Sequence, residues 1–332
     1  MKTIQLNSRP VGIPKLSDFK FVNKEKPTLA DGEILLKANY ISVDPYLRGR
    51  MMEGKSYVAP FELNKVMSSG MIAEVVESKL NGFSKGDHVS GMMEWKEFQT
   101  SKGEGLMKVD GSHVSLSVYL GVLGMTGLTA YLGLTEIGKP KAGETVVVSG
   151  AAGAVGSVVG QIAKIKGCRV VGIAGSDEKV EELKSKYGFD AGINYKTTTN
   201  MTQAIAECCP EGVDVYFDNV GGEISDAVMM NVNRFARIIV CGAISMYNAT
   251  SVPMGPRVQP ILIKNSALMQ GFIVSNYTEK FGVAIPQLAK YVQEGKIIST
   301  ETIVKGFDNV PQAFINLFEG KNKGKMIVEI EA

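Results

Sequence analysis

The feature that most constrains the fold is a glycine-rich segment, SGAAGAVG (Ser149 to Gly156), between a β-branched run and a helix-length amphipathic stretch. At such a strand-to-helix turn, glycines let the backbone approach a pyrophosphate, and the helix N-terminus offers N–H groups to its charge. Gly153 stands where that close approach is needed, and Gly156 where the helix packs on the strand. Ala151 replaces the first glycine of the usual GxGxxG pattern, which leaves Gly150 to supply the turn. The segment therefore predicts a dinucleotide-binding turn.

The pattern around this turn indicates a parallel sheet. From Glu144 the chain alternates apolar runs (TVVVSG, RVVGIAG, AGIN, VDVYFDNVG, RIIVCGA, LMQGFIV) with expected helices at 154–166, 177–186 and 279–294 and one ending near 208. Alternating strands and helices predict crossover connections in a parallel sheet. Before Asp110, short alternating runs broken by glycines predict a β-rich domain instead.

Length and composition narrow the class of protein. A chain of 332 residues favours two domains. A net charge of +2 offers no broad basic surface, so we expect no nucleic-acid or membrane partner.

The uncharged segment Val114 to Thr135 is diluted by glycines, which favours a buried interdomain segment over a membrane span. The densest lysine group, Lys321, Lys323 and Lys325, is expected to be a solvated turn.

Targeting and cysteine usage indicate a cytoplasmic protein. The first residues, MKTIQLNSRPVGIP, lack an apolar core of signal-peptide length. The four cysteines (Cys168, Cys208, Cys209 and Cys241) show no CxxC spacing, so we expect reduced thiols.

The end of the second apolar run indicates which dinucleotide is bound. NAD-selective sites place an acidic residue at the end of this strand to bind the ribose 2′-hydroxyl. Here the strand ends in Ala174, Gly175 and Ser176, and Asp177 follows late enough to cap the next helix. Lys179 is placed to reach a 2′-phosphate instead. The sequence therefore favours NADP(H) over NAD.

Several longer motifs together resemble one family across nearly the whole chain. They are ISVDPYLRGRM (41–51), LGMTGLTAYLGL (123–134), the segment from SGAAGAVG through GSDEK, FDNVGGE (217–223), VCGAISMYN (240–248) and GKNKGKMIV near the end. The chain resembles the prostaglandin reductase and leukotriene B4 12-hydroxydehydrogenase family, zinc-independent medium-chain dehydrogenase/reductases that include curcumin reductase and alkenal double-bond reductases.

The resemblance implies an α/β fold: a Rossmann parallel-sheet domain (126–296) inserted in a β-rich, GroES-like catalytic domain (1–125, completed by 297–332), with the active site in the cleft. The last strand, KMIVEI, is expected to rejoin the first domain. Family members are commonly dimers built by edge pairing of Rossmann sheets, so we expect a homodimer.

The resemblance also implies which residues bind NADPH. The expected contacts, by motif, are Gly153, Ala154, Val155, Gly156, Lys179, Tyr195, Asn219, Cys241, Gly242, Ala243, Ile244, Ser245, Tyr247, Phe272, Ile273, Val274 and Asn322. Lys179 and Tyr195 would hold the 2′-phosphate. From the residues alone, Tyr195 is equally an ordinary rim tyrosine, and Asn219 is equally a turn residue before two glycines.

The expected reaction is reduction of the C=C bond of an α,β-unsaturated aldehyde or ketone. Hydride addition at the β-carbon yields an enolate, and a phenol can donate a hydrogen bond to its oxygen while uncharged. The family places such a tyrosine at Tyr247; its alternative role is to close over the substrate. Tyr46 is the second candidate and otherwise lines the pocket. For Arg48 and Arg50, a structural role is favoured over one in substrate entry.

Two other functions remain open at this stage. A quinone oxidoreductase would share the glycine loop and NADPH, and a non-enzymatic NADPH sensor or scaffold would keep only the fold. A catalytic zinc site is disfavoured, because it needs about three protein ligands and the chain has only His88 and His113. No metal is expected.

Overall fold

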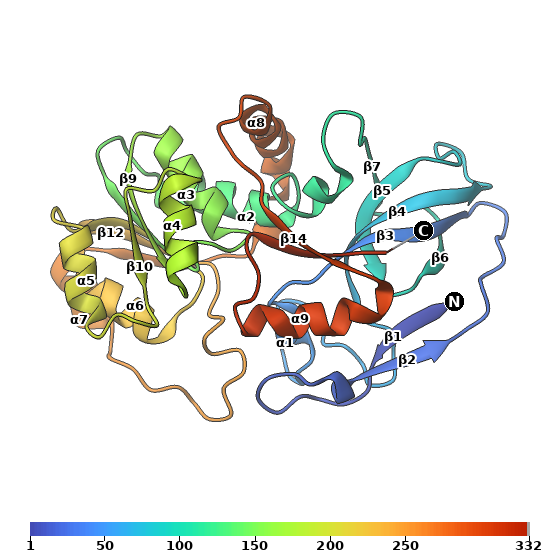
Figure 1. The fold of residues 1–332 in the computed structure, drawn as a ribbon, viewed down its shortest axis with the longest axis horizontal. Helices are drawn as coiled ribbons and strands as arrows, with labels where there is room; N and C mark the ends of the chain where they lie inside the picture. Colours follow the sequence, from blue (N-terminus) through green and yellow to red (C-terminus); the bar gives the residue numbers. More distant parts are fainter. Residues whose placement is uncertain (331–332) are drawn as a thin grey trace. The chain divides into compact units, whose positions relative to one another are not determined.

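The computed structural model describes residues 1–330, which form two compact units (Figure 1). The first unit comprises residues 1–120 and the chain from Glu301 onward. The second comprises Gly121–Thr300.

The first unit is built on an open, mostly antiparallel sheet with the order β14-β15-β3-β4-β5-β7, while β6 also pairs with β3. These strands are β3 (Ile34–Ser42), β4 (Ser68–Ser78), β5 (His88–Glu94), β6 (Phe98–Ser101), β7 (Met107–Val109), β14 (Glu301–Lys305) and β15 (Lys325–Glu329). A separate hairpin joins β1 (Lys2–Leu6) to β2 (Phe19–Asn23). Because β15 pairs antiparallel with β3, the prediction that the last strand rejoins the first domain is confirmed.

Two helices complete the core of this unit. The short α1 (Leu47–Arg50) follows β3, and α9 (Val310–Phe318) lies between β14 and β15. Phe314 of α9 is fully buried and meets Phe19 edge-on at 6.2 Å between ring centroids. Trp95, also fully buried, stacks on the same Phe19 ring. These aromatic contacts fix α9 over the apolar interior.

The second unit is a six-stranded parallel sheet with the order β10-β9-β8-β11-β12-β13. Its strands are β8 (Thr145–Ser149), β9 (Arg169–Ala174), β10 (Ala191–Asn194), β11 (Val213–Asp218), β12 (Val232–Val240) and β13 (Leu268–Gly271). Its α-helices are α2 (Met125–Leu132), α3 (Gly156–Ile165), α4 (Asp177–Ser185), α5 (Met201–Cys208), α6 (Gly222–Met229), α7 (Gln259–Asn265) and α8 (Phe281–Gln293). The chain order reverses between β8 and β11, and ligands bind beyond the carboxyl ends of strands at such a switch point. The predicted α/β fold with a Rossmann sheet is confirmed.

One local prediction changes. The helix expected from Ala154 begins at Gly156, because residues 151–155 form turns that extend the glycine-rich loop. The segment Val114 to Thr135 is broken into a 3₁₀ turn, Leu116–Leu120, and the separate helix α2. Within residues 1–330, no helix has the length and apolarity needed to cross a membrane.

Candidate functional site

The glycine-rich turn between β8 and α3 has the geometry of a phosphate-binding turn. Gly150 has a φ of 59°, a left-handed conformation that glycine adopts without strain. A Cβ at Gly156 would lie 2.4 Å from the carbonyl oxygen of Gly150, so a side chain there would push α3 away from the turn. Gly153, Ala154 and Val155 lie in the turn itself, directly before α3. Since the first N–H groups of a helix lack partners within it, the turn fits a pyrophosphate.

The carboxyl end of β9 brings together the residues expected at a 2′-phosphate. Ser176 caps α4 by accepting a hydrogen bond from the Lys179 N–H at 3.3 Å. The Tyr195 ring lies over Gly175, where a Cβ would be 3.0 Å from the phenol oxygen. Asp177 accepts a bond from the Asn194 side chain at 2.7 Å. Lys179 lies in the first turn of α4, after β9, and Tyr195 directly follows the neighbouring parallel strand β10, so the two residues come from the carboxyl ends of adjacent strands.

A buried aspartate occupies the end of β11. Asp218 is 3% exposed, and its Oδ1 accepts hydrogen bonds from the Ser149 hydroxyl at 2.9 Å and the Tyr216 phenol at 2.8 Å. The next residue, Asn219, donates its side-chain amide to the Ser149 carbonyl at 2.8 Å. The side chain of Asn219 thus bridges β8 and β11 at the switch point. The sequence left open whether Asn219 contacts the cofactor or only forms a turn before two glycines, and this bridge is a role beyond that of a turn residue. Nothing in the sequence analysis singled out Asp218.

The loop after β12, Cys241 to Tyr247, is fastened to the loop after β11. The N–H groups of Cys241 and Gly242 donate to the Asp218 carbonyl at 2.8 and 3.1 Å. Further along, the N–H of Ile244 donates to Asn219 at 3.4 Å and that of Ser245 to Val220 at 3.1 Å. Burial raises the pKa of the Cys241 thiol to about 12. The thiol therefore stays protonated and unreactive near neutral pH.

Tyr247 folds back over its own loop. Its phenol oxygen accepts the Ala243 N–H at 3.3 Å, and a Cβ on Gly242 would lie 3.3 Å from the same oxygen. Burial raises the pKa of Tyr247 above its usual range. The hydroxyl therefore keeps its proton at neutral pH, and that proton remains available for donation because the bond to Ala243 uses a lone pair.

The segment after β13 supplies Phe272, Ile273 and Val274. The Phe272 ring packs edge-on against Phe217 at 6.4 Å between centroids and fills the space beside Gly133. Because β13 pairs with β12 in parallel, Gly271 opposite Val240, this segment leaves the sheet beside Cys241. Because the Phe272 ring packs within the unit, any contact with a ligand would come from the backbone of Phe272 and from Ile273 and Val274.

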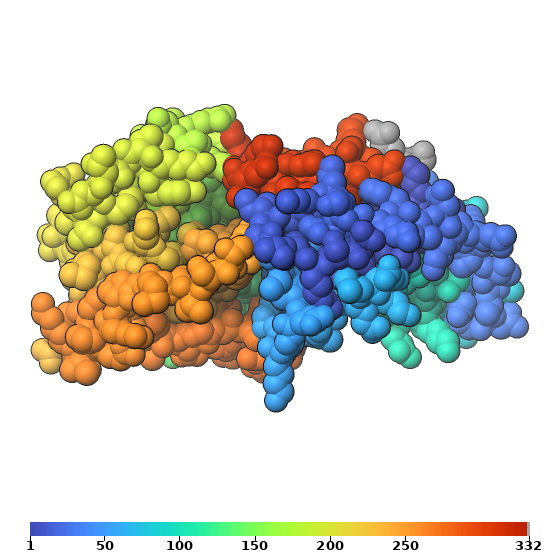
Figure 2. Space-filling view, turned by 90° about the horizontal axis from the view of Figure 1, so that it is seen from below, coloured from blue at the N-terminus to red at the C-terminus, as the bar shows by residue number. Residues whose placement is uncertain are grey.

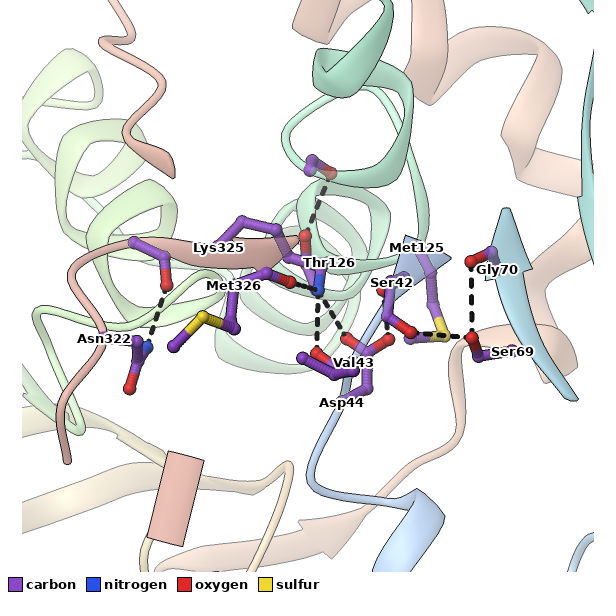
Figure 3. Close-up of polar contacts among 12 residues, drawn as sticks. Ser42, Val43, Asp44, Ser69, Gly70, Met125, Thr126, Asn322, Lys325 and Met326 are labelled. Carbon is purple, nitrogen blue, oxygen red and sulfur yellow. Dashed lines mark hydrogen bonds and ion pairs between the residues drawn. The ribbon is translucent and has the colours of Figure 1, made fainter. Parts of the chain in front are cut away.

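Two expected site residues, Tyr46 and Asn322, belong to the first unit. Tyr46 directly precedes α1 and packs against the apolar core, and burial raises its pKa far above the usual range. Asn322 lies before β15 and donates its side-chain amide to the Gly324 carbonyl at 2.9 Å (Figure 3).

The same region holds a buried ion pair that the sequence analysis missed. The expectation of a solvated turn is wrong for Lys325, which is 3% exposed and begins β15. Its ammonium lies 3.2 Å from Asp44 Oδ1 and donates to the carbonyls of Val43 and Met326 at 2.9 and 2.7 Å (Figure 3). The Ser42 hydroxyl donates to the other carboxylate oxygen of Asp44. The available signal was that Lys325 directly precedes the continuous apolar run Met326 to Val328 of the expected last strand.

The two arginines of the DPYLRGR motif are used structurally. Arg48 is 2% exposed and donates to the carbonyls of Pro10 and Gly12. Arg50 stacks on the Phe61 ring at 3.8 Å and donates to the Ala59 carbonyl at 3.0 Å. The structural role favoured from the sequence fits these contacts. Among residues 1–330, no group of three His, Cys, Asp or Glu side chains is placed to hold a metal ion.

Comparisons with known proteins agree with this geometry. Residues 2–109 match a family described as the N-terminal domain of oxidoreductase, and residues 154–290 match one described as zinc-binding dehydrogenase. A putative NADP-dependent oxidoreductase of Bacillus subtilis is 59% identical over 98% of this chain and 97% of its own length. Bovine prostaglandin reductase 1 is 48% identical over 99% of this chain and 98% of its own length.

A solved structure matches over the full length of both chains. The NADPH complex of CurA from Vibrio vulnificus is 44% identical, has a TM-score of 0.95, and covers 100% of each chain. Other relatives include NADPH-dependent curcumin reductase of Escherichia coli and NADP-dependent 2-alkenal reductase of tobacco. The chain belongs to the family of prostaglandin reductase 1, curcumin reductase and 2-alkenal reductase, NADP-dependent oxidoreductases of the medium-chain dehydrogenase/reductase superfamily.

Proposed function

We propose that this protein uses NADPH to reduce the C=C bond of small α,β-unsaturated aldehydes and ketones. The observation that carries the proposal is the Tyr247 phenol, which stays protonated, accepts a bond from Ala243 and keeps its own proton to donate. Relatives named as prostaglandin, curcumin and 2-alkenal reductases support the substrate class.

The protein's part in the reaction is to bind the cofactor, orient the substrate and stabilise developing charge. When bound, NADPH supplies the hydride that adds to the β-carbon. The residues after β8 and β9 would hold its phosphates, and the small residues Gly242 and Ala243 would let the nicotinamide lie close to the backbone. Tyr247 donates a hydrogen bond to the carbonyl oxygen as the enolate forms. Water then protonates the α-carbon.

Lys179 and Tyr195 determine the preference for NADPH over NADH in this proposal. Lys179 follows β9, and the Tyr195 ring, from the end of the adjacent β10, lies against Gly175 at the end of β9, where an acidic residue would be needed to select NAD. Replacing Lys179 by Ala should weaken NADPH binding much more than NADH binding. An equal effect on both cofactors, measured by fluorescence titration, would remove this role.

Tyr46 is proposed to line the substrate pocket, with Tyr247 as the donor to the oxygen. Asp44, which pairs with Lys325, also accepts the Leu47 N–H on its carbonyl at 3.1 Å and so closes the turn that contains Tyr46. Because Tyr46 would contact the substrate without donating to its carbonyl oxygen, Tyr46→Phe should change KM more than kcat.

The protein is also proposed to form a homodimer through the outer edge of β13. This strand ends the six-stranded sheet, and Leu268 on it is 47% exposed. The neighbouring loop from Ala249 to Val258 and helix α7 also lie at the surface (Figure 2). Light scattering during size-exclusion chromatography should give twice the 35.7 kDa chain mass; a monomer at micromolar concentration would refute the dimer.

The experiment that tests the function is an NADPH-oxidation screen across alkenals, enones and quinones, with wild-type and Tyr247→Phe protein. Enones should be turned over with the saturated carbonyl as product, and Tyr247→Phe should lower kcat about 100-fold while leaving NADPH affinity unchanged. Full turnover by Tyr247→Phe would remove the role of this tyrosine. Turnover of quinones alone would replace the proposal by a quinone reductase, and tight NADPH binding without turnover by a sensor.

A further inference from the structure

We propose that Asp218 is a positioning residue that holds three loops of the NADP(H) site in one arrangement. These loops are Ser149–Gly156 after β8, Asn219–Gly222 after β11 and Cys241–Tyr247 after β12. The proposal rests on cofactor binding and not on the reaction assigned to Tyr247, so each can fail without the other.

The side chain of Asp218 fastens two of the loops. Its Oδ1 accepts the Ser149 hydroxyl at 2.9 Å, at the start of the glycine-rich turn. The same oxygen accepts the N–H groups of Val220 and Gly221 at 3.0 and 2.9 Å, which turns the chain sharply after β11. Gly221 follows this turn with a φ of 69°, a conformation that a side chain would resist.

The backbone of Asp218 fastens the third loop. Its carbonyl accepts the N–H groups of both Cys241 and Gly242, so β12 ends against the same residue. The Ser149 hydroxyl, while donating to Asp218, also accepts the Asn219 N–H at 3.0 Å. One aspartate and one serine therefore set the spacing of the ends of β8, β11 and β12.

The remaining partner is a buried phenol. Tyr216 is fully buried and donates its hydroxyl to Asp218 Oδ1 at 2.8 Å. Burial and the adjacent carboxylate raise the pKa of Tyr216 well above its usual range, so it stays a donor. Among the described residues, the donors to this oxygen are all neutral, and Asp218 takes part in no ion pair. A buried carboxylate stabilised only by such donors loses that stabilisation if the loops move apart.

The test compares Asp218 with an aspartate of the same unit that lies at the opposite end of the sheet. Asp190 accepts the Val170 N–H at 2.7 Å near the start of β9 and pairs with Lys164 at 2.9 Å. Asp218→Ala, Asp218→Asn and Asp190→Ala would each be measured for NADPH dissociation constant by fluorescence. Hydrogen exchange at residues 219–222 and 241–243 would be followed in the cofactor-free protein.

Asp218→Ala should weaken NADPH binding about tenfold or more and speed exchange in both segments. Asp218→Asn keeps an acceptor oxygen and should restore most of the affinity. Asp190→Ala should leave both readouts within twofold of wild type, whatever it does to the melting temperature. If Asp218→Ala does not fold, Ser149→Ala and Tyr216→Phe each remove one donor and should still speed exchange at 219–222. Unchanged affinity and exchange in the folded Asp218 and Ser149 variants would overturn the proposal, as would an equal effect of Asp190→Ala.

Discussion

Two buried aspartates at strand ends, one in each unit, are stabilised in different ways. Asp44, just after β3, is 4% exposed and pairs with the equally buried ammonium of Lys325. Asp218, at the end of β11, is 3% exposed and is held by neutral hydroxyl and N–H donors. In the first case the charge of one residue is balanced by the charge of another. In the second case the charge of Asp218 is stabilised by hydrogen-bond donors on the surrounding loops. Removing the Asp218 carboxylate should therefore disturb the positions of these loops more than it lowers the stability of the protein.

The largest expected effect comes from breaking the ion pair. Asp44→Asn leaves the Lys325 ammonium buried without its counter-charge, and we expect the free energy of unfolding to fall by about 3–5 kcal/mol. Urea denaturation measures this free energy of unfolding. The double variant Asp44→Asn, Lys325→Met removes both charges and should recover most of the loss. If the two substitutions were instead additive, the pair would contribute no coupling and the comparison would fail.

A smaller loss of stability is expected at the other aspartate. Asp218→Asn removes a charge but leaves no unpaired cation, so unfolding should become easier by only about 1–2 kcal/mol. The ranking should reverse for the cofactor: NADPH affinity should fall about tenfold or more in Asp218→Ala and stay at the wild-type value in folded Asp44→Asn. Calorimetric titration measures the NADPH affinity, and urea denaturation measures the free energy of unfolding. If the Asp44 variant lost more than the Asp218 variant in both assays, the proposed difference between the two aspartates would be contradicted.

The smallest effect concerns Glu301, the cross-strand neighbour of Lys325. Burial raises the pKa of its carboxyl above the ordinary value of 4.5, although Ser117 donates to it. Folding therefore favours the protonated acid, and this stabilisation is complete below pH 4.5 and is lost as pH rises through the folded pKa. Glu301→Gln, which mimics the protonated form, should match wild type in acid and become the more stable protein as pH rises. A difference that is constant with pH would mean that Glu301 does not titrate as described.

The parallel sheet and its glycine-rich turn followed from the sequence because both depend on local periodicity. β-branched runs alternating with amphipathic stretches specify strands and crossover helices, and Gly150 was already the expected source of the tight turn. Its φ of 59° fits that expectation. The start of α3 was misplaced by two residues, because small residues such as Ala154 suit a helix and a turn equally.

The buried charges could not be predicted in the same way. Lys325 stands among other lysines, and its burial depends on pairing with Asp44, which lies far away along the chain. Asp218 stood within the predicted strand run VDVYFDNVG, but its four donors come from Ser149, Tyr216, Val220 and Gly221, which only the folded sheet brings together. Local patterns identify elements; tertiary contacts decide which polar residue is buried among them.

The most direct test of the proposed function follows the hydride itself. The protein would be supplied with NADPH carrying deuterium at the transferred position and with a simple enone, and the product would be examined by NMR. Reduction of the C=C bond predicts a saturated ketone with deuterium on the β-carbon. An allylic alcohol with deuterium on the former carbonyl carbon would contradict the account.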